Sequence, residues 1–191
     1  TLLAQVDASV GGKTAINHPK GKNLIGAFHQ PKLVLIDVET LRTLPPADVR
    51  SGLAEIIKTG VIMDISLFNQ IEGDIDAILD MDASILSDII AQSCADKAHV
   101  VASDEKESGM RATLNYGHTF GHALESLTDY GTYRHGEAVA IGMNCAARLA
   151  VNLGLLEVVD WERQYNLLES AELPVDFPSG IQPEELIEAM Y

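Results

Sequence analysis

The chain has 191 residues, of which 47% are hydrophobic and 21% are charged, so it is globular rather than disordered. Its formal net charge of −15 argues against nucleic acid as a partner, because nucleic-acid-binding surfaces are basic. No apolar stretch predicts a membrane span and no signal peptide is visible at the start, so we expect a cytoplasmic protein. The two cysteines lie in predicted helices without CxxC spacing and are expected to be buried free thiols.

Charge is distributed unevenly along the chain. The first 36 residues carry four lysines against one aspartate, whereas the remainder carries nine basic and 27 acidic residues. A lysine-rich segment in an acidic protein suggests a local anion site for a small ligand. The alternative is a basic loop that is merely solvated.

Residues 8–26, rich in glycine, lysine and asparagine, show little periodicity and predict a long functional loop. The string "VGGKT" within it resembles a phosphate-binding P-loop, but the position five before Gly12 is Asp7 rather than glycine, and no helix follows. A nucleotide triphosphatase is therefore not expected, although the glycines and lysines suit anion binding. "KLVLID", residues 32–37, predicts a short buried strand.

From Pro45 onward, apolar residues recur at helical spacing. Proline at the start of a segment and glycine at the end, as at Gly154, mark helix boundaries. The sequence therefore predicts a strand-containing N-terminal part followed by a mainly α domain. Helices are predicted over 45–62, 82–105, 114–127, 136–154, 160–173 and 183–191.

One predicted helix carries an unusual polar stripe. Arg111, Asn115, His118 and His122 are spaced four, three and four residues apart, so they share one face of a helix. Such a face predicts the wall of a polar pocket, and two histidines four residues apart can share a metal ion. The glycine before each histidine would let another backbone or a ligand approach closely. The alternative is a pair of surface histidines.

Three further residues are candidates for the same site. Glu55 lies among apolar residues, where a carboxylate is costly unless it is paired or bound to metal. Lys58, one turn on, is either its salt-bridge partner or a second functional group. His135, just before a helix, can supply a third metal ligand. Lys97, on the apolar face of its helix, either snorkels or directs its ammonium into a site.

Four strings together resemble the 3-dehydroquinate synthase family over nearly the whole chain: "VDASVGGKTAINHPKGKNLIGAFHQPKLVLID", "GLAEIIKTG", "LNYGHTFGHALE" and "HGEAVAIGM". The resemblance implies a zinc or cobalt site at Glu55, His118 and His135, with His122 contacting substrate instead of metal. It implies further catalytic or substrate residues at Lys13, Asn23, Lys58, Lys97, Glu107, Arg111, Asn115 and His122. It implies NAD-side residues at Thr1, Asp7, Lys13, Lys22 and Thr43.

The implied activity is an NAD- and metal-dependent carbon–oxygen lyase reaction of the shikimate pathway of aromatic amino acid biosynthesis. It converts 3-deoxy-arabino-heptulosonate 7-phosphate to 3-dehydroquinate and phosphate by oxidation of a hydroxyl, loss of phosphate, reduction of the ketone and ring closure. Lys97 and Arg111 are expected to hold the substrate carboxylate, and the phosphate is expected at Lys13, Asn23, Asn115 and His122.

The resemblance also implies a domain organisation. Residues 1–45 are expected to end an α/β NAD-binding domain, and residues 46–191 to form a helical metal- and substrate-binding domain. Family members are longer than this chain, so the glycine-rich NAD loop and a C-terminal substrate lysine are expected to lie outside it. We expect a homodimer for the full-length protein.

Three other functions fit parts of the pattern. A sibling sugar-phosphate cyclase would keep the metal ligands but vary the carboxylate-binding positions, and Arg111 and Asn115 favour the dehydroquinate reaction over it. A metal-dependent alcohol dehydrogenase-like protein would not need both Lys97 and Arg111. A non-enzymatic zinc module would have a closed site with four ligands.

Overall fold

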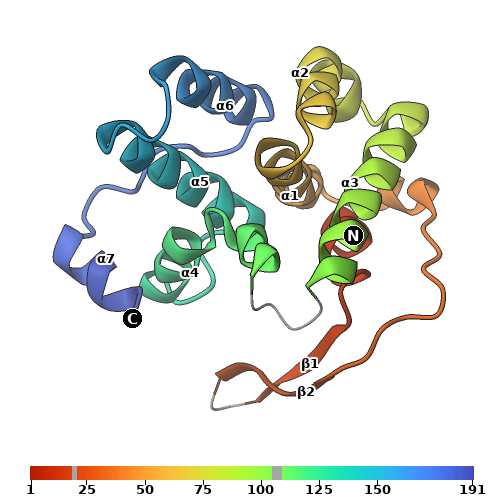
Figure 1. The fold of residues 1–191 in the computed structure, drawn as a ribbon, viewed down its shortest axis with the longest axis horizontal. Coiled ribbons are helices and arrows are strands. Elements are labelled where there is room, and N and C mark those ends of the chain that lie inside the picture. The colour runs from red at the N-terminus through yellow and green to blue at the C-terminus, as the bar shows by residue number, and fades with distance from the viewer. Residues whose placement is uncertain (19–20, 105–108) are drawn as a thin grey trace.

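The structure is a computed structural model that describes residues 1–18, 21–104 and 109–191 (Figure 1). It is mainly helical, as the sequence predicts, and the described residues form one two-stranded sheet. In chain order the elements are η1 (Ala4–Ala8), β1 (Lys13–His18), β2 (Gly21–Phe28), η2 (Val38–Thr43), α1 (Pro46–Ile62), α2 (Ile65–Leu79), α3 (Ala83–Ser103), η3 (Met110–Asn115), α4 (His118–Leu127), α5 (His135–Asn152), α6 (Val158–Ser170) and α7 (Pro183–Ala189).

Helix α1 is the centre of the molecule and lies between the α2–α3 pair and the α4–α5–α6 group (Figure 1). Pro46 occupies its first turn, where a missing N–H costs nothing. Leu53, Ile56 and Ile57 are fully buried in one core that also includes side chains of α2, α3, α5 and α6. Because α1 is buried from Ser51 to Gly60, the polar side chains of Glu55, Lys58 and Thr59 are held away from bulk water.

The two helices on one side of α1 have matching N-terminal caps. The Asp64 carboxylate accepts hydrogen bonds from the first backbone N–H groups of α2, and Asp82 does the same for α3. Such caps satisfy donors that have no partner inside the helix and are worth about 1 kcal/mol each. Helix α2 was not among the predicted helices, whereas the structure confirms the helices predicted around 45–62, 82–105, 136–154, 160–173 and 183–191.

Glycines let α5 touch its neighbours through backbone atoms. A Cβ on Gly142 would lie 2.0 Å from the carbonyl oxygen of Gly117, and one on Gly136 would lie 1.9 Å from that of Ser51. Gly117 itself has φ of +78°, a conformation that favours glycine. The N-terminal end of α4 and the middle of α1 are therefore held against α5 at distances that no side chain would permit.

The predicted loop over residues 8–26 is wrong over residues 13–18 and 21–26, where β1 and β2 form an antiparallel hairpin. Lys13 lies opposite Phe28, and Ile16 lies opposite Ile25. The hairpin extends away from the helical body (Figure 1). Its ladder is made by backbone hydrogen bonds. Its apolar residues stand next to each other, as at Ala15–Ile16 and Leu24–Ile25, so the sequence lacks the alternation by which strands are recognised.

The predicted strand "KLVLID" is also wrong. Residues 33–36 are assigned to neither strand nor helix, and Leu33 and Leu35 are 81% and 89% exposed. A strand needs a neighbouring strand to satisfy its backbone hydrogen bonds, and the sheet in the described part of the chain contains β1 and β2 alone.

The cysteines and the apolar helices test two further predictions from the sequence. Cys94 and Cys145 are free, as predicted, but half-buried rather than fully buried. None of the helices in the described ranges is long and apolar enough to cross a membrane.

The close contact of α5 with α4 predicts opposite effects for two glycine substitutions. Gly142→Ala should lower the free energy of unfolding by about 1–3 kcal/mol, because the new methyl group overlaps the Gly117 carbonyl. Gly73→Ala, in α2 with nothing within 4 Å of the added Cβ, should raise it by about 0.5–1 kcal/mol. Urea denaturation of both variants measures the difference; equal effects would contradict the packing described here.

Candidate metal and substrate site

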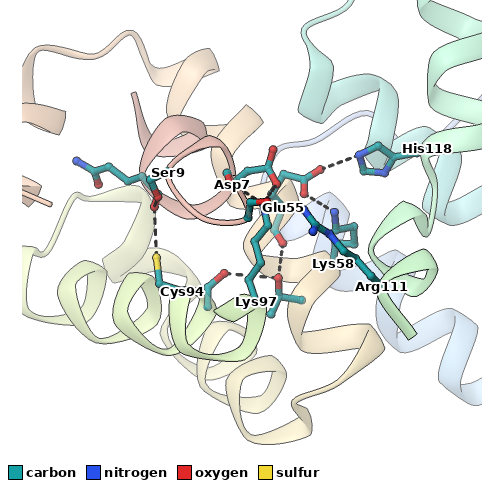
Figure 2. A network of polar contacts seen from close by, with 12 residues as sticks. Asp7, Ser9, Glu55, Lys58, Cys94, Lys97, Arg111 and His118 are labelled. Carbon is teal, nitrogen blue, oxygen red and sulfur yellow. Dashed lines mark hydrogen bonds and ion pairs between the residues drawn. The ribbon is translucent and has the colours of Figure 1, made fainter. Parts of the chain in front are cut away.

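Three side chains from three helices converge beside the buried face of α1. Glu55 comes from the middle of α1, His118 from the first residue of α4 and His135 from the first residue of α5. The Glu55 Oε1 atom lies 3.7 Å from His118 Nε2 and 3.8 Å from His135 Nε2. Figure 2 shows Glu55 between His118 and Lys58.

The convergence follows from the helix contacts. The backbone N–H of Gly136 donates to Ser51 Oγ at 3.0 Å, which fixes the start of α5 one helical turn from Glu55. Gly117 takes a left-handed backbone conformation, which separates η3 from α4, and α4 begins at the next residue, His118. The predicted continuous helix from Arg111 is therefore wrong: residues 110–115 form the separate 3₁₀ helix η3. The glycines of this segment admit another backbone, as predicted, and that backbone is α5.

The oxygens of the Glu55 carboxylate have different surroundings. Oε2 pairs with Lys58 Nζ at 2.5 Å, and both side chains are buried. Oε1 is buried without a hydrogen-bond partner in the described part of the chain, although it faces two imidazole nitrogens. Ligands of a tetrahedral zinc ion lie about 2.0–2.2 Å from the metal and so about 3.4 Å from one another, close to the observed separations. The donor set therefore fits a divalent cation.

Both histidines present Nε2 to Glu55 because their Nδ1 atoms have other acceptors. His118 Nδ1 lies 3.1 Å from the Tyr116 carbonyl oxygen. Burial lowers the pKa of His118 to about 4, and this effect outweighs the raising influence of Glu55. The imidazole is therefore neutral at neutral pH, as a metal ligand must be.

His135 has the same arrangement with a side-chain acceptor. Its Nδ1 atom lies 3.4 Å from Glu125 Oε1. Burial lowers the pKa of His135, but the hydrogen bond to Glu125 and the charges of Glu55 and Glu125 outweigh it, so the net pKa is raised. In the cation-free protein His135 consequently holds a proton more readily than His118 does.

The cluster opens into a cavity of about 720 Å³ between the hairpin, η1 and the helical body. The His122 ring, one turn after His118, lies 5.3 Å from the His118 ring and 5.9 Å from the His135 ring between centroids. The polar lining is mostly cationic or imidazole. It consists of Asp7, Lys13, Thr14, Lys58, Lys97, Arg111, Asn115, His118, His122 and His135.

Lys97 does not snorkel along its helix. Its Nζ atom donates to the carbonyl oxygen and to Oδ1 of Asp7, each at 2.5 Å, from a position on the cavity wall (Figure 2). Burial raises the pKa of Asp7, but the ion pair and hydrogen bond with Lys97 outweigh it and lower the pKa below its ordinary value. Lys97 and Asp7 therefore form a charged pair at the edge of the cavity.

Arg111 is held in place by a hydrogen bond to the backbone of Gly11, in the segment just before the hairpin. It is 2% exposed, and one of its terminal nitrogens donates to the Gly11 carbonyl oxygen at 2.9 Å. A Cβ on Gly11 would lie 2.9 Å from the same nitrogen, so only glycine leaves room for this contact. The guanidinium is thus fixed in direction while still lining the cavity.

The structure does not bring every predicted residue to this cavity. Thr1 and Thr43 are exposed and are not among its lining residues. Asn23 and Lys22 belong to β2, and their side chains are not described. Glu107 lies outside the described residues.

Sequence reasoning missed three residues that support the site. These are Ser51, Tyr116 and Glu125, which hold Gly136, His118 and His135 respectively. Glu125 could have been found, because it follows His122 by three residues and so lies near the same helix face. The contacts of Ser51 and of the Tyr116 carbonyl depend on the approach of separate helices, and nothing local in the sequence indicates them.

Curated relatives resemble the chain over its whole length. 3-Dehydroquinate synthase of Desulforamulus reducens is 56% identical over 191 residues, which are 100% of this chain and 53% of that protein. 3-Dehydroquinate synthase of a Synechococcus strain is 57% identical over 192 residues, covering 100% of the chain and 52% of that protein. The chain thus spans about half the length of the curated relatives it matches.

Solved structures show the same fold. The 2-epi-5-epi-valiolone synthase ValA of Streptomyces hygroscopicus subsp. jinggangensis 5008, with NAD+ and Zn2+ bound, has a TM-score of 0.89 and 29% identity, covering 100% of this chain and 53% of that chain. A 2-deoxy-scyllo-inosose synthase complexed with carbaglucose-6-phosphate, NAD+ and Co2+ has a TM-score of 0.87 and 31% identity, covering 100% and 52%.

Two family models account for the chain from end to end. The model described as 3-dehydroquinate synthase N-terminal matches residues 1–51, and the one described as 3-dehydroquinate synthase C-terminal matches residues 52–191. Together with relatives more than 50% identical, these matches confirm the resemblance found in the four sequence strings. The chain belongs to the 3-dehydroquinate synthase family.

Proposed function

We propose that this chain forms the metal- and substrate-binding part of a 3-dehydroquinate synthase, which converts 3-deoxy-arabino-heptulosonate 7-phosphate to 3-dehydroquinate and phosphate. The observation that carries the proposal is the buried Glu55 oxygen that faces two imidazole nitrogens at the end of a cationic cavity. A carbon–oxygen lyase acting on a phosphorylated sugar acid needs both an electrophilic centre and a site for two anionic groups.

Glu55, His118 and His135 would hold a divalent cation, zinc or cobalt, as bound in the two solved relatives. When bound, the cation supplies Lewis-acid polarisation of a substrate oxygen, and NAD supplies a reversible hydride acceptor. Three protein ligands leave coordination positions open to substrate, as in catalytic zinc sites. Lys58 neutralises the second Glu55 oxygen, so the carboxylate offers one oxygen to the cation.

Arg111 and Lys97 are suited to the substrate carboxylate. The contact with Gly11 fixes the direction of the Arg111 guanidinium on the cavity wall, and a guanidinium held in this way suits the planar geometry of a carboxylate. Lys97 is already paired with a carboxylate, Asp7, on the cavity wall. A substrate carboxylate would share the Lys97 ammonium with Asp7. Asp7 itself is proposed to lie on the NAD side of the site, as the family pattern implies.

The phosphate is proposed to lie between the hairpin and α4. Lys13 at the start of β1, Asn115 at the end of η3 and His122 in α4 line the same cavity from opposite sides. Asn23, Glu107, Lys22, Thr1 and Thr43 remain proposed site residues on the family pattern alone. Lys13 contributes an ammonium charge, and the imidazole and amide contribute directional hydrogen bonds.

A sibling cyclase that acts on a sugar phosphate without a carboxylate is the second candidate. The solved siblings have the same fold but only 29–31% identity, against 50–59% for curated 3-dehydroquinate synthases. The buried Arg111 on the cavity wall also favours a substrate with a carboxylate, because a planar guanidinium can bind a carboxylate through two parallel hydrogen bonds.

The proposal extends to organisation and location. We propose that residues 1–45 belong to the NAD-binding domain and residues 46–191 form the helical domain. The full-length protein is proposed to be a cytoplasmic homodimer that contributes to chorismate and aromatic amino acid biosynthesis.

The assay of choice is phosphate release by the full-length protein that contains this chain. With NAD and zinc it should release phosphate from 3-deoxy-arabino-heptulosonate 7-phosphate, whereas glucose 6-phosphate, which has no carboxylate, should give none. The 191-residue chain alone should not turn over, because we propose that NAD contacts outside it are required. Preference for the carboxylate-free sugar would favour the sibling cyclase instead.

Loss of one proposed ligand should remove the metal. In the full-length protein, His135→Ala should abolish bound zinc measured by elemental analysis of the dialysed protein, since two remaining ligands cannot complete the site. The matched control is His122→Ala, one turn from His118, which should retain one zinc per chain. Full metal retention by His135→Ala would show that the ligands are assigned wrongly.

The carboxylate assignment rests on the geometry of one guanidinium. Arg111→Lys should lower kcat/KM at least about tenfold, equivalent to ~1.4 kcal/mol, because lysine keeps the charge but loses the planar fork. Zinc content should stay unchanged. Arg163→Lys is the control, because Arg163 also meets a carboxylate, Glu72, but on the outer surface. Unchanged kcat/KM in Arg111→Lys would leave Arg111 with a purely structural role.

A further inference from the structure

Glu125 is a buried carboxylate that the proposed reaction does not use. It lies on α4, is 7% exposed, and sits beside Leu124 and Ala123, which are also buried. Its Oε1 atom lies 3.4 Å from Nδ1 of His135. A buried carboxylate is costly unless it has a charged or hydrogen-bonding partner, so this contact with a proposed metal ligand requires an explanation.

The two proposed histidine ligands are held in the same way. Each turns Nε2 toward Glu55 Oε1 and Nδ1 toward an oxygen acceptor. For His118 the acceptor is the Tyr116 carbonyl, whereas for His135 it is the Glu125 carboxylate. Because an imidazole can bind a metal through one nitrogen while the other carries the proton, an acceptor at Nδ1 selects the tautomer that leaves Nε2 free.

We propose that Glu125 is a positioning residue that fixes the tautomer and ring orientation of His135 and raises its strength as a ligand. This inference rests on the proposed metal site. A carboxylate behind a ligating histidine makes that histidine more basic, and loss of such a partner costs about 10–100-fold in metal affinity. The neutral Tyr116 carbonyl at Nδ1 of His118 raises the basicity of that imidazole less than a carboxylate would. Glu125 therefore makes His135 the stronger of the two histidine ligands.

The same atoms suggest one competing arrangement. Ligand atoms of His122, Glu125 and His135 lie within 4.8 Å of one another, as they would around a second cation. That cation would bind Nδ1 of His135, so the imidazole would have to lose both protons to serve two cations at once. A hydrogen bond between Nδ1 and Glu125 needs no such deprotonation, and the observed 3.4 Å contact already provides it.

The test compares zinc affinity in full-length protein variants by competition with a coloured chelator at fixed pH. Glu125→Gln keeps the size of the side chain but removes its charge, and it should weaken zinc binding about 10–100-fold. The control Glu72→Gln removes a carboxylate that pairs with Arg163 on the surface, and should leave the affinity unchanged. Cobalt-loaded Glu125→Gln should also show a shifted visible absorption band, which a distant packing defect would not produce.

Several outcomes would count against the inference. Zinc affinity within twofold of wild type in Glu125→Gln overturns it while leaving the metal site intact. Two zinc ions per wild-type chain, falling to one in Glu125→Gln, would make Glu125 a ligand instead. If Glu125→Gln does not fold, Glu125→Asp, which keeps the charge but withdraws it from His135, must still weaken binding more than twofold. A wild-type protein that binds no zinc removes the proposed metal site itself, and this inference with it.

Discussion

The candidate site depends on one packing constraint, the direct contact of α5 with the backbones of α1 and α4. Gly136 against Ser51 and Gly142 against Gly117 leave no room for a side chain at either crossing. Because His135 and His118 begin their helices next to these crossings, the contacts decide where the backbones of both histidines lie, and the acceptors at Nδ1 then orient the rings. Glu55, one turn from Ser51 on the buried α1, is then the carboxylate they meet. Protein interiors are close-packed and have low compressibility, so a shift at either crossing would also move the histidines beside it.

Much of the helical body could be predicted from the sequence. Helices with a clear apolar stripe and a proline or glycine boundary, such as α1 and α5, are recognisable because burial against a core requires that spacing. Glu55 stood out for a similar reason: a carboxylate among isoleucines and leucines needs a partner wherever it lies. The roles of Glu55, His118 and His135 as a set came only from the family resemblance, since local spacing paired His118 with His122.

What sequence reasoning missed depends on contacts between distant segments. The stripe that includes Arg111 and His118 was assigned to one helix because local spacing cannot show that Gly117 takes a left-handed conformation against α5. The hairpin is held by backbone ladders, which leave little trace in composition. Residues 32–37 have the composition of a buried strand, but a strand forms only beside another, and Leu35 is exposed in the described chain.

The contrast between an acidic body and a cationic cavity has a kinetic consequence. The protein carries a net charge of −15, yet Lys13, Lys58, Lys97 and Arg111 gather in one hollow. At physiological ionic strength charges are screened beyond about 8 Å, so the outer acids repel an incoming anion mainly when salt is low. Added salt should first remove this long-range barrier, before it weakens the partly buried attraction inside. The association rate of an anionic ligand would then rise with salt over this range. For a uniformly basic protein the association rate would fall over the same range.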